Sequence, residues 1–243
     1  MKPIAIFQHH PEDGPGHFLD FAQRAHVPVV LFRGDQGQPL PTSIKPFSAL
    51  VSLGGPMSVN DRLDFIEYET LLMEEAIAHD IPILGHCLGG QLLARTLGAE
   101  VRALVPAGRE IGWSRVAPAD GALPDWVAPL AQGDVFQWHN ENFSLPANAR
   151  LLLQNASCPH QAFLHGPHLG LQFHIEITAD KIRAWCRESG DEARQWAHLP
   201  SVQSPEAMME ALDARVAVSN RMADALYRQW ALALHPGRTP CLS

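Results

Sequence analysis

Short apolar runs separated by helix-like stretches fill the first third of the chain, and this order constrains the fold more than any other feature. The runs cover residues 4–7, 27–32, 49–53 and 81–84. Continuous apolar runs of this length are typical of strands that are buried on both faces. Residues 16–26 and 64–79 have the character of helices. The resulting β-α-β-α order predicts a doubly wound α/β fold with a mostly parallel central sheet flanked by helices.

The pattern changes after a predicted helix at residues 91–97. Strand-like runs at 101–105, 111–116, 135–138, 151–154, 161–164 and 169–173 follow one another with short turns. No long helix separates them, so we expect an antiparallel or mixed extension of the same sheet.

The chain is expected to be helical from residue 178 onward. Ser204 and Pro205 are a typical helix cap and first helical residue. Apolar residues then recur at intervals of three and four from Met209 to Trp230. This seam predicts a helix that packs on the same domain, with a homodimer interface as the alternative. We therefore expect residues 1–190 to form one domain and residues 191–243 to form a helical extension packed on it.

Composition excludes several classes of protein. The 243 residues carry a formal net charge of −8, and Lys and Arg do not cluster, which argues against nucleic-acid binding. No apolar stretch approaches the roughly 20 residues of a membrane span. The four cysteines, Cys87, Cys158, Cys186 and Cys241, form no Cys-x-x-Cys pair. They are typical of thiols in a reducing compartment, so we expect a cytoplasmic protein. No His/Cys spacing fits a structural zinc site, and we expect no metal or cofactor.

Cys87 lies in the most informative segment of the sequence. An apolar strand runs into Gly85-His86-Cys87-Leu88-Gly89, and a helix follows. This is the arrangement of a nucleophile elbow with cysteine in place of serine, in which the helix N-terminus favours the thiolate. The N–H group of Leu88 would face a tetrahedral oxyanion, and Gly55, after another predicted strand, could supply a second donor. A buried structural cysteine is the alternative interpretation.

A thiolate nucleophile needs a histidine base and a group that orients it. His174 and Glu176 end a strand-like run, and residues two apart on an extended segment point the same way. This pair is therefore the candidate base and its orienting carboxylate. His86 is interpreted as a packing or polar-surface residue. The remaining histidines in polar stretches are expected to face solvent; they are His9, His10, His17, His160, His165 and His168.

Three blocks of the sequence, in this order, resemble the class I (triad) glutamine amidotransferase family. They are Gly54-Gly55-Pro56, residues 85–94, and Gln172-Phe173-His174-Ile175-Glu176. The resemblance covers roughly residues 4–185. It is closest to stand-alone proteins similar to the glutaminase domain of GMP synthase, whose Trp-His segment is similar to residues 135–141. The family usually has proline where Ile175 stands.

The resemblance implies a mechanism and a set of site residues. Cys87 would attack the side-chain amide of glutamine and form a γ-glutamyl thioester, with Leu88 and Gly55 holding the oxyanion. His174, oriented by Glu176, would move the protons. The residues implied to contact the substrate are Gln91, Trp138, His139 and Asn140.

Three functions remain open from the sequence. The first is a glutaminase or amidotransferase, for which the family implies a separate synthetase subunit that receives the ammonia. The second is a γ-glutamyl peptidase that acts on small γ-glutamyl peptides. The third is a non-catalytic binding module on the same fold. The chain has no Gly-rich phosphate-binding loop with Lys-Ser/Thr, so we do not expect it to activate an acceptor with ATP.

Overall fold

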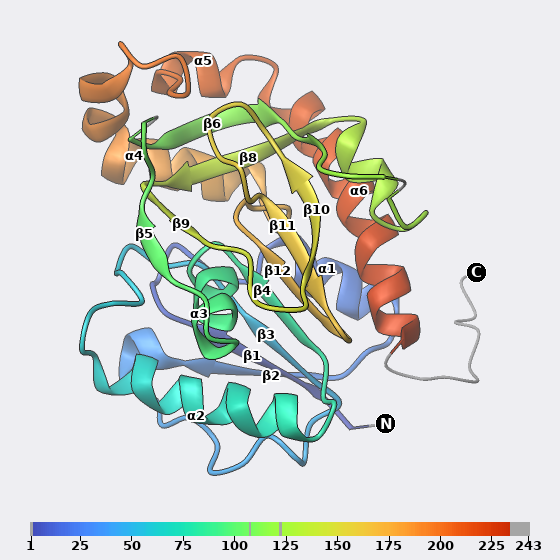
Figure 1. The fold of residues 1–243 in the computed structure, drawn as a ribbon. Helices are drawn as coiled ribbons and strands as arrows, with labels where there is room; N and C mark the ends of the chain where they lie inside the picture. The colour runs from blue at the N-terminus through green and yellow to red at the C-terminus, as the bar shows by residue number, and fades with distance from the viewer. Residues whose placement is uncertain (1, 107, 122, 234–243) are drawn as a thin grey trace.

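Eight strands form one mixed sheet at the centre of the molecule (Figure 1). The computed structural model describes residues 2–106, 108–121 and 123–233, so Cys241 lies outside the described residues. The strand order is β2-β1-β3-β4-β12-β11-β10-β7. The strands are β1 (Ile4–Gln8), β2 (Val29–Arg33), β3 (Ala49–Ser52), β4 (Ile83–His86), β7 (Ala117–Pro118), β10 (Arg150–Gln154), β11 (Ala162–His165) and β12 (His168–Leu171).

The pairing of these strands confirms the predicted fold class. The first four strands and β12 pair in parallel, whereas β11, β10 and β7 add an antiparallel edge. All five parallel strands therefore end at the same edge of the sheet. In open α/β sheets this carboxyl edge is where ligands bind.

Helices cover both faces of the sheet. Strand β1 directs Ile4 and Ile6 into a core with α1 (His17–Arg24) and α6 (Leu212–Ala233). The alternate residues, Ala5 and Phe7, pack with α2 (Asp64–Ala78) and α3 (Leu88–Thr96) on the other face. Figure 1 shows α1 beside α6 on one side and α2 on the opposite side. The period-two alternation of β1 is that of a strand with two buried faces.

Three of the predicted strand-like runs, at residues 101–105, 111–116 and 135–138, do not join the central sheet. Strand β5 (Val101–Ala103) pairs with β9 (Glu141–Phe143), and β6 (Glu110–Arg115) pairs with β8 (Asp134–His139). The prediction that they extend the same sheet is therefore wrong. These small sheets lie above the carboxyl edge, where β8 meets the chain after β12 through backbone bonds between Phe136 and His174. Two short 3-10 turns, Gly34–Gln36 and Ala128–Ala131, complete the described elements of this part of the chain.

The C-terminal region contains α4 (Ala179–Trp196), α5 (Pro205–Met209) and α6. Ser204 caps α5 as predicted, but the expected continuous helix is wrong, because the backbone breaks where Ala211 adopts a φ of 51°. The apolar seam still finds cover: Leu226 and Trp230 are buried in the core that α6 shares with α1. Of the helices within the described residues, none is long and apolar enough to span a bilayer.

Candidate active site

The turn between β4 and α3 holds Cys87 in a strained conformation. Its φ of 50° lies in the left-handed region, which non-glycine residues rarely adopt. A Cβ atom at Gly85 would collide with the backbone of Gly89, and one at Gly89 would collide with Ser52. Two glycines therefore allow strand and helix to approach closely enough for this turn, as the sequence predicts. Cys87 stands at the start of α3, where the helix dipole favours an anion.

His174 is placed to exchange a proton with Cys87. The thiol of Cys87 is one of the groups that raise the pKa of the imidazole, and His174 Nδ1 lies 2.6 Å from Glu176 Oε1. The imidazole is buried against Trp185, with the ring centroids 4.8 Å apart. Burial alone would lower the pKa of His174, but the Glu176 carboxylate and the contact with Cys87 raise it to about 10. At neutral pH the geometry therefore favours an imidazolium beside the sulfur.

Lys181 completes the surroundings of Glu176. Its Nζ donates to Glu176 Oε1 at 2.8 Å and to the carbonyl of Gly14 at 3.0 Å, although the side chain is buried. Burial would raise the pKa of Glu176, yet the charges of Lys181 and His174 hold it well below its usual value. The carboxylate thus stays ionised and keeps the imidazole oriented.

The other oxygen of Glu176 faces a second buried group. No described residue donates a hydrogen bond to Oε2, but His86 Nε2 lies 3.9 Å from it. Burial lowers the pKa of His86 to about 4 despite the carboxylate, so this imidazole is neutral. Its Nε2 is 3.2 Å from the hydroxyl of Tyr227 on α6. His86 is therefore a packing residue behind the base and not a surface residue.

The candidate oxyanion donors are the backbone N–H groups of Leu88 and Gly55. Leu88 is the first residue of α3, and the first N–H groups of a helix lack intrahelical acceptors. Gly55 follows β3 and lines the same cavity as Cys87. A Cβ at Gly55 would lie 2.6 Å from Met57 Sδ and 3.0 Å from Leu88 Cδ2. The turn after β3 therefore packs directly on the start of α3.

A cavity of about 180 Å³ opens over the cysteine at the carboxyl edge of the sheet. All four predicted substrate-contacting residues line it: Gln91, Trp138, His139 and Asn140. Gln91 Nε2 donates to the carbonyl of Glu141 at 3.1 Å, which ties α3 to the chain after β8. Helix α4 supplies another wall, which includes Trp185 and Glu192. The sequence thus identified residues that the fold brings to one cavity.

The sequence model for the class-I glutamine amidotransferases matches residues 22–184. The chain belongs to this family. A solved glutamine amidotransferase of Methylobacillus flagellatus superposes with a TM-score of 0.89 at 38% identity, over 95% of this chain and 94% of that one. A putative glutamine amidotransferase-like protein of Salmonella typhimurium, YfeJ, is 27% identical over 76% of this chain and 80% of its own length. One of the subunits of the glutamine-hydrolysing GMP synthase of Saccharolobus solfataricus is 32% identical over 55% of this chain and 70% of its own.

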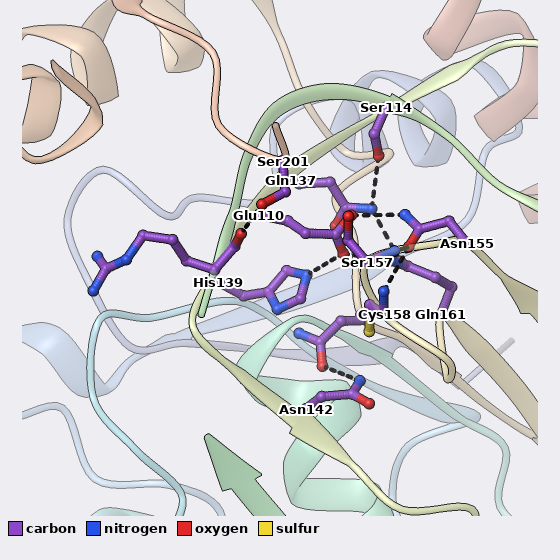
Figure 2. A network of polar contacts seen from close by, with 12 residues as sticks. Glu110, Ser114, Gln137, His139, Asn142, Asn155, Ser157, Cys158, Gln161 and Ser201 are labelled. Atoms are coloured by element: carbon purple, nitrogen blue, oxygen red, sulfur yellow. Dashed lines mark hydrogen bonds and ion pairs between the residues drawn. The ribbon is translucent and has the colours of Figure 1, made fainter. Parts of the chain in front are cut away.

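His139 belongs to a buried network of polar side chains that includes Glu110 and Gln161 (Figure 2). Its Nδ1 lies 2.9 Å from the carbonyl of Glu141, and its Nε2 lies 3.1 Å from Glu110 Oε2. The buried carboxylate of Glu110 also accepts hydrogen bonds from Gln161 at 2.6 Å and Asn155 at 2.7 Å. Both ring nitrogens of His139 are therefore engaged within the protein. Its side chain therefore ties the end of β8 to Glu110 on β6 and to Glu141 on β9.

Glu110, His139 and Cys158 are the one candidate metal cluster among the described residues, with ligand atoms within 4.8 Å of one another. The carboxylate of Glu110 and both ring nitrogens of His139 already take part in hydrogen bonds within the protein. Burial raises the pKa of the Cys158 thiol, and the carboxylate of Glu110 raises it further, so the thiol stays protonated. In the structure, two of the three candidate ligand groups are therefore hydrogen-bonded, and the third is a protonated thiol.

Sequence reasoning missed several groups around the site. His9, His17 and His168 are buried, so the expectation that they face solvent is wrong. Lys181 and Tyr227 come from helices beyond the last recognised motif. The carboxylate of Asp13 is buried beside the cavity, 3.7 Å from Lys181 Nζ. No local pattern in the sequence marks these residues, because tertiary packing determines where each of them lies.

Proposed function

We propose that this amidotransferase hydrolyses the side-chain amide of glutamine through a γ-glutamyl thioester on Cys87. The observation that carries the proposal is that Cys87 and His174 line one cavity on the carboxyl edge of the sheet, with His174 hydrogen-bonded to Glu176. A nucleophile, a base and an orienting carboxylate in this order are the requirements for acyl transfer.

In the first half of the proposed reaction, the Cys87 sulfur attacks the amide carbon. The carbonyl oxygen becomes an oxyanion, which the N–H groups of Leu88 and Gly55 stabilise. The raised pKa of His174 keeps its proton in place until the carbon–nitrogen bond breaks. The proton then passes to the departing nitrogen, which leaves as ammonia. The enzyme is left with a thioester between Cys87 and the γ-carbonyl.

In the second half, water attacks the thioester. His174, now neutral, takes a proton from the water, and the same two N–H groups hold the new oxyanion. The carbon–sulfur bond breaks, glutamate leaves, and the proton returns to the pair formed by Cys87 and His174. Glu176 stays ionised throughout, because Lys181 lies 2.8 Å from it.

The cavity supports a small substrate held by the chain around Trp138, His139 and Asn140. The name of the similar Saccharolobus protein, which is part of a glutamine-hydrolysing synthase, supports a second proposal: the ammonia passes to a separate synthetase subunit. A γ-glutamyl peptidase would use the same reacting groups and differ only in the room beyond the amide nitrogen. A non-catalytic binding module would need none of these reacting groups.

Purified protein offered glutamine and a γ-glutamyl dipeptide in parallel would test the proposal. We expect ammonia from glutamine, slower release of amino acid from the dipeptide, and no turnover of either by Cys87→Ala. Cys186→Ala, which removes a half-buried thiol on α4, is the matched control and should keep full activity. Faster cleavage of the dipeptide would indicate a peptidase. Equal turnover by Cys87→Ala and wild type would exclude Cys87 as the nucleophile.

A further inference from the structure

His9 is a buried imidazole that the proposed mechanism does not use. It follows β1 directly, is 6% exposed, and stacks on Phe65 with the ring centroids 5.8 Å apart. Its Nε2 lies 2.7 Å from Glu69 Oε2 on α2. The other oxygen of Glu69 accepts a hydrogen bond from Ser52 Oγ at 2.6 Å. Three elements, β1, β3 and α2, thus fix the position of this one ring.

The free end of this network contacts the turn after β3. His9 Nδ1 lies 3.2 Å from the carbonyl oxygen of Gly54. The carbonyl oxygen of Gly54 can only accept, so Nδ1 must carry a hydrogen. A second hydrogen on Nε2, toward Glu69, makes the ring an imidazolium. Burial opposes this charged state, but Glu69 raises the pKa of His9 above its ordinary value. His9 therefore donates to Gly54 with the strength of a charge-assisted hydrogen bond.

The bond to Gly54 also determines where Gly55 points. The carbonyl of Gly54 and the N–H of Gly55 belong to one planar trans peptide, so they face in opposite directions. With the carbonyl held toward His9, the N–H is turned to the other side of the turn. Gly55 lines the cavity that contains Cys87, and a Cβ on it would meet His9 Cβ at 3.2 Å on the buried side. A rotation of this peptide would replace a donor with a carbonyl oxygen at the oxyanion.

We propose that His9, held by Glu69, is a positioning residue that locks the Gly54–Gly55 peptide with its N–H group toward the oxyanion. The inference rests on the proposed function, because an oxyanion forms only if Cys87 attacks an amide. It assigns a role to a residue outside the stretch matched by the family model, which begins at residue 22. His9 should affect the rate mainly through the transition state. The carbonyl oxygen of the bound substrate carries little negative charge, whereas the oxyanion that the N–H group of Gly55 stabilises carries a full one.

Two substitutions separate this role from a merely structural one. The amide nitrogen of asparagine reaches the place of a histidine Nδ1, whereas that of glutamine reaches the place of Nε2. His9→Asn therefore keeps the donor to Gly54 and loses the contact with Glu69. His9→Gln keeps the contact with Glu69 and loses the donor to Gly54. A role confined to satisfying the buried Glu69 predicts that His9→Asn is the more damaged variant, and the proposal predicts the reverse.

The measurement is the steady-state kcat and KM for glutamine, with thermal unfolding to show that each variant is folded. We expect His9→Gln to lower kcat by about ten- to a hundredfold, below the loss for removing an oxyanion donor outright, with KM within about twofold. His9→Asn should keep kcat within about threefold of wild type, because the donor remains. Equal kcat values for wild type and His9→Gln, or a lower kcat for His9→Asn than for His9→Gln, would overturn the proposal.

Glu69→Gln serves if either His9 variant fails to fold. Its amide can donate to Nε2 of a neutral His9, which then still donates from Nδ1 to Gly54, so kcat should stay within a few-fold of wild type. A loss of kcat as large as that expected for His9→Gln would show that the bond to Gly54 does not matter. The proposed function has its own test: it fails if Cys87→Ala turns over glutamine. That outcome does not depend on which of the two His9 variants has the lower kcat.

Discussion

Gly54→Ala should disable the base while leaving the fold intact. A Cβ at this position would lie 2.7 Å from His174 Cε1, and an ordinary contact begins at 3.4 Å, so the ring or the turn must move by about 0.7 Å. The ring cannot yield freely, because it is buried between Glu176 and Trp185. A misplacement near 1 Å can cost about a hundredfold in rate, which corresponds to about 2.7 kcal/mol of barrier. We expect kcat/KM for glutamine to fall by about that factor.

Gly14→Ala is the matched control for this substitution. Its Cβ would meet only the side chain of Gln8, at 3.6 Å, in the loop whose carbonyl binds Lys181. We expect activity within about twofold of wild type for this variant, because an ordinary contact requires no shift. Both proteins should be assayed for ammonia release and for thermal unfolding. Wild-type kcat/KM in a folded Gly54→Ala would refute the argument that the turn and the base are packed in contact.

Three further predictions concern the groups behind the site. Tyr227→Phe removes the hydroxyl partner of His86 and should lower the free energy of unfolding in urea by about 1–2 kcal/mol. Tyr68→Phe, at an exposed position, is the control and should change this free energy little. Equal effects of the two substitutions would contradict the contact between Tyr227 and His86. Because folding raises the pKa of His174 from 6.5 to about 10, its stabilising charge is fully present below pH 6.5 and is lost as pH rises through about 10. The unfolding free energy of wild type relative to His174→Gln should therefore fall over that range, and a constant difference would contradict the assignment. Burial raises the pKa of the Cys158 thiol, so peptide mapping should find it alkylated by iodoacetamide at neutral pH only after denaturation.

The parts of the site that the sequence predicted are encoded within a few residues of one another. The elbow around Cys87 depends on glycines two positions away on either side. The His174–Glu176 contact follows from the alternation of an extended segment, and the structure places these atoms 2.6 Å apart. Local spacing of this kind is visible in one sequence because no tertiary information is needed to interpret it.

The groups that the sequence missed depend on packing between distant segments. His9 and Glu69 are 60 positions apart, and His86 and Tyr227 are 141 positions apart. A polar residue in a polar stretch such as Gln8-His9-His10 gives no sign that a helix will cover it. The predicted helix from Ser204 onward was wrong for a related reason, since the apolar spacing continues across the break at Ala211. The domain boundary at residue 190, a homodimer and a cytoplasmic location stay predictions.

The central claim is that Cys87 carries the γ-glutamyl group of glutamine as a thioester. The most direct test is to mix the protein with glutamine, quench it in acid during turnover, digest it, and measure the masses of its cysteine-containing peptides. The account predicts a γ-glutamyl adduct on the peptide containing Cys87, and none on those containing Cys158 or Cys186. An adduct on another residue would contradict this claim. So would rapid ammonia release by wild type in which Cys87 is unmodified at every quench time, together with full activity of Cys87→Ala.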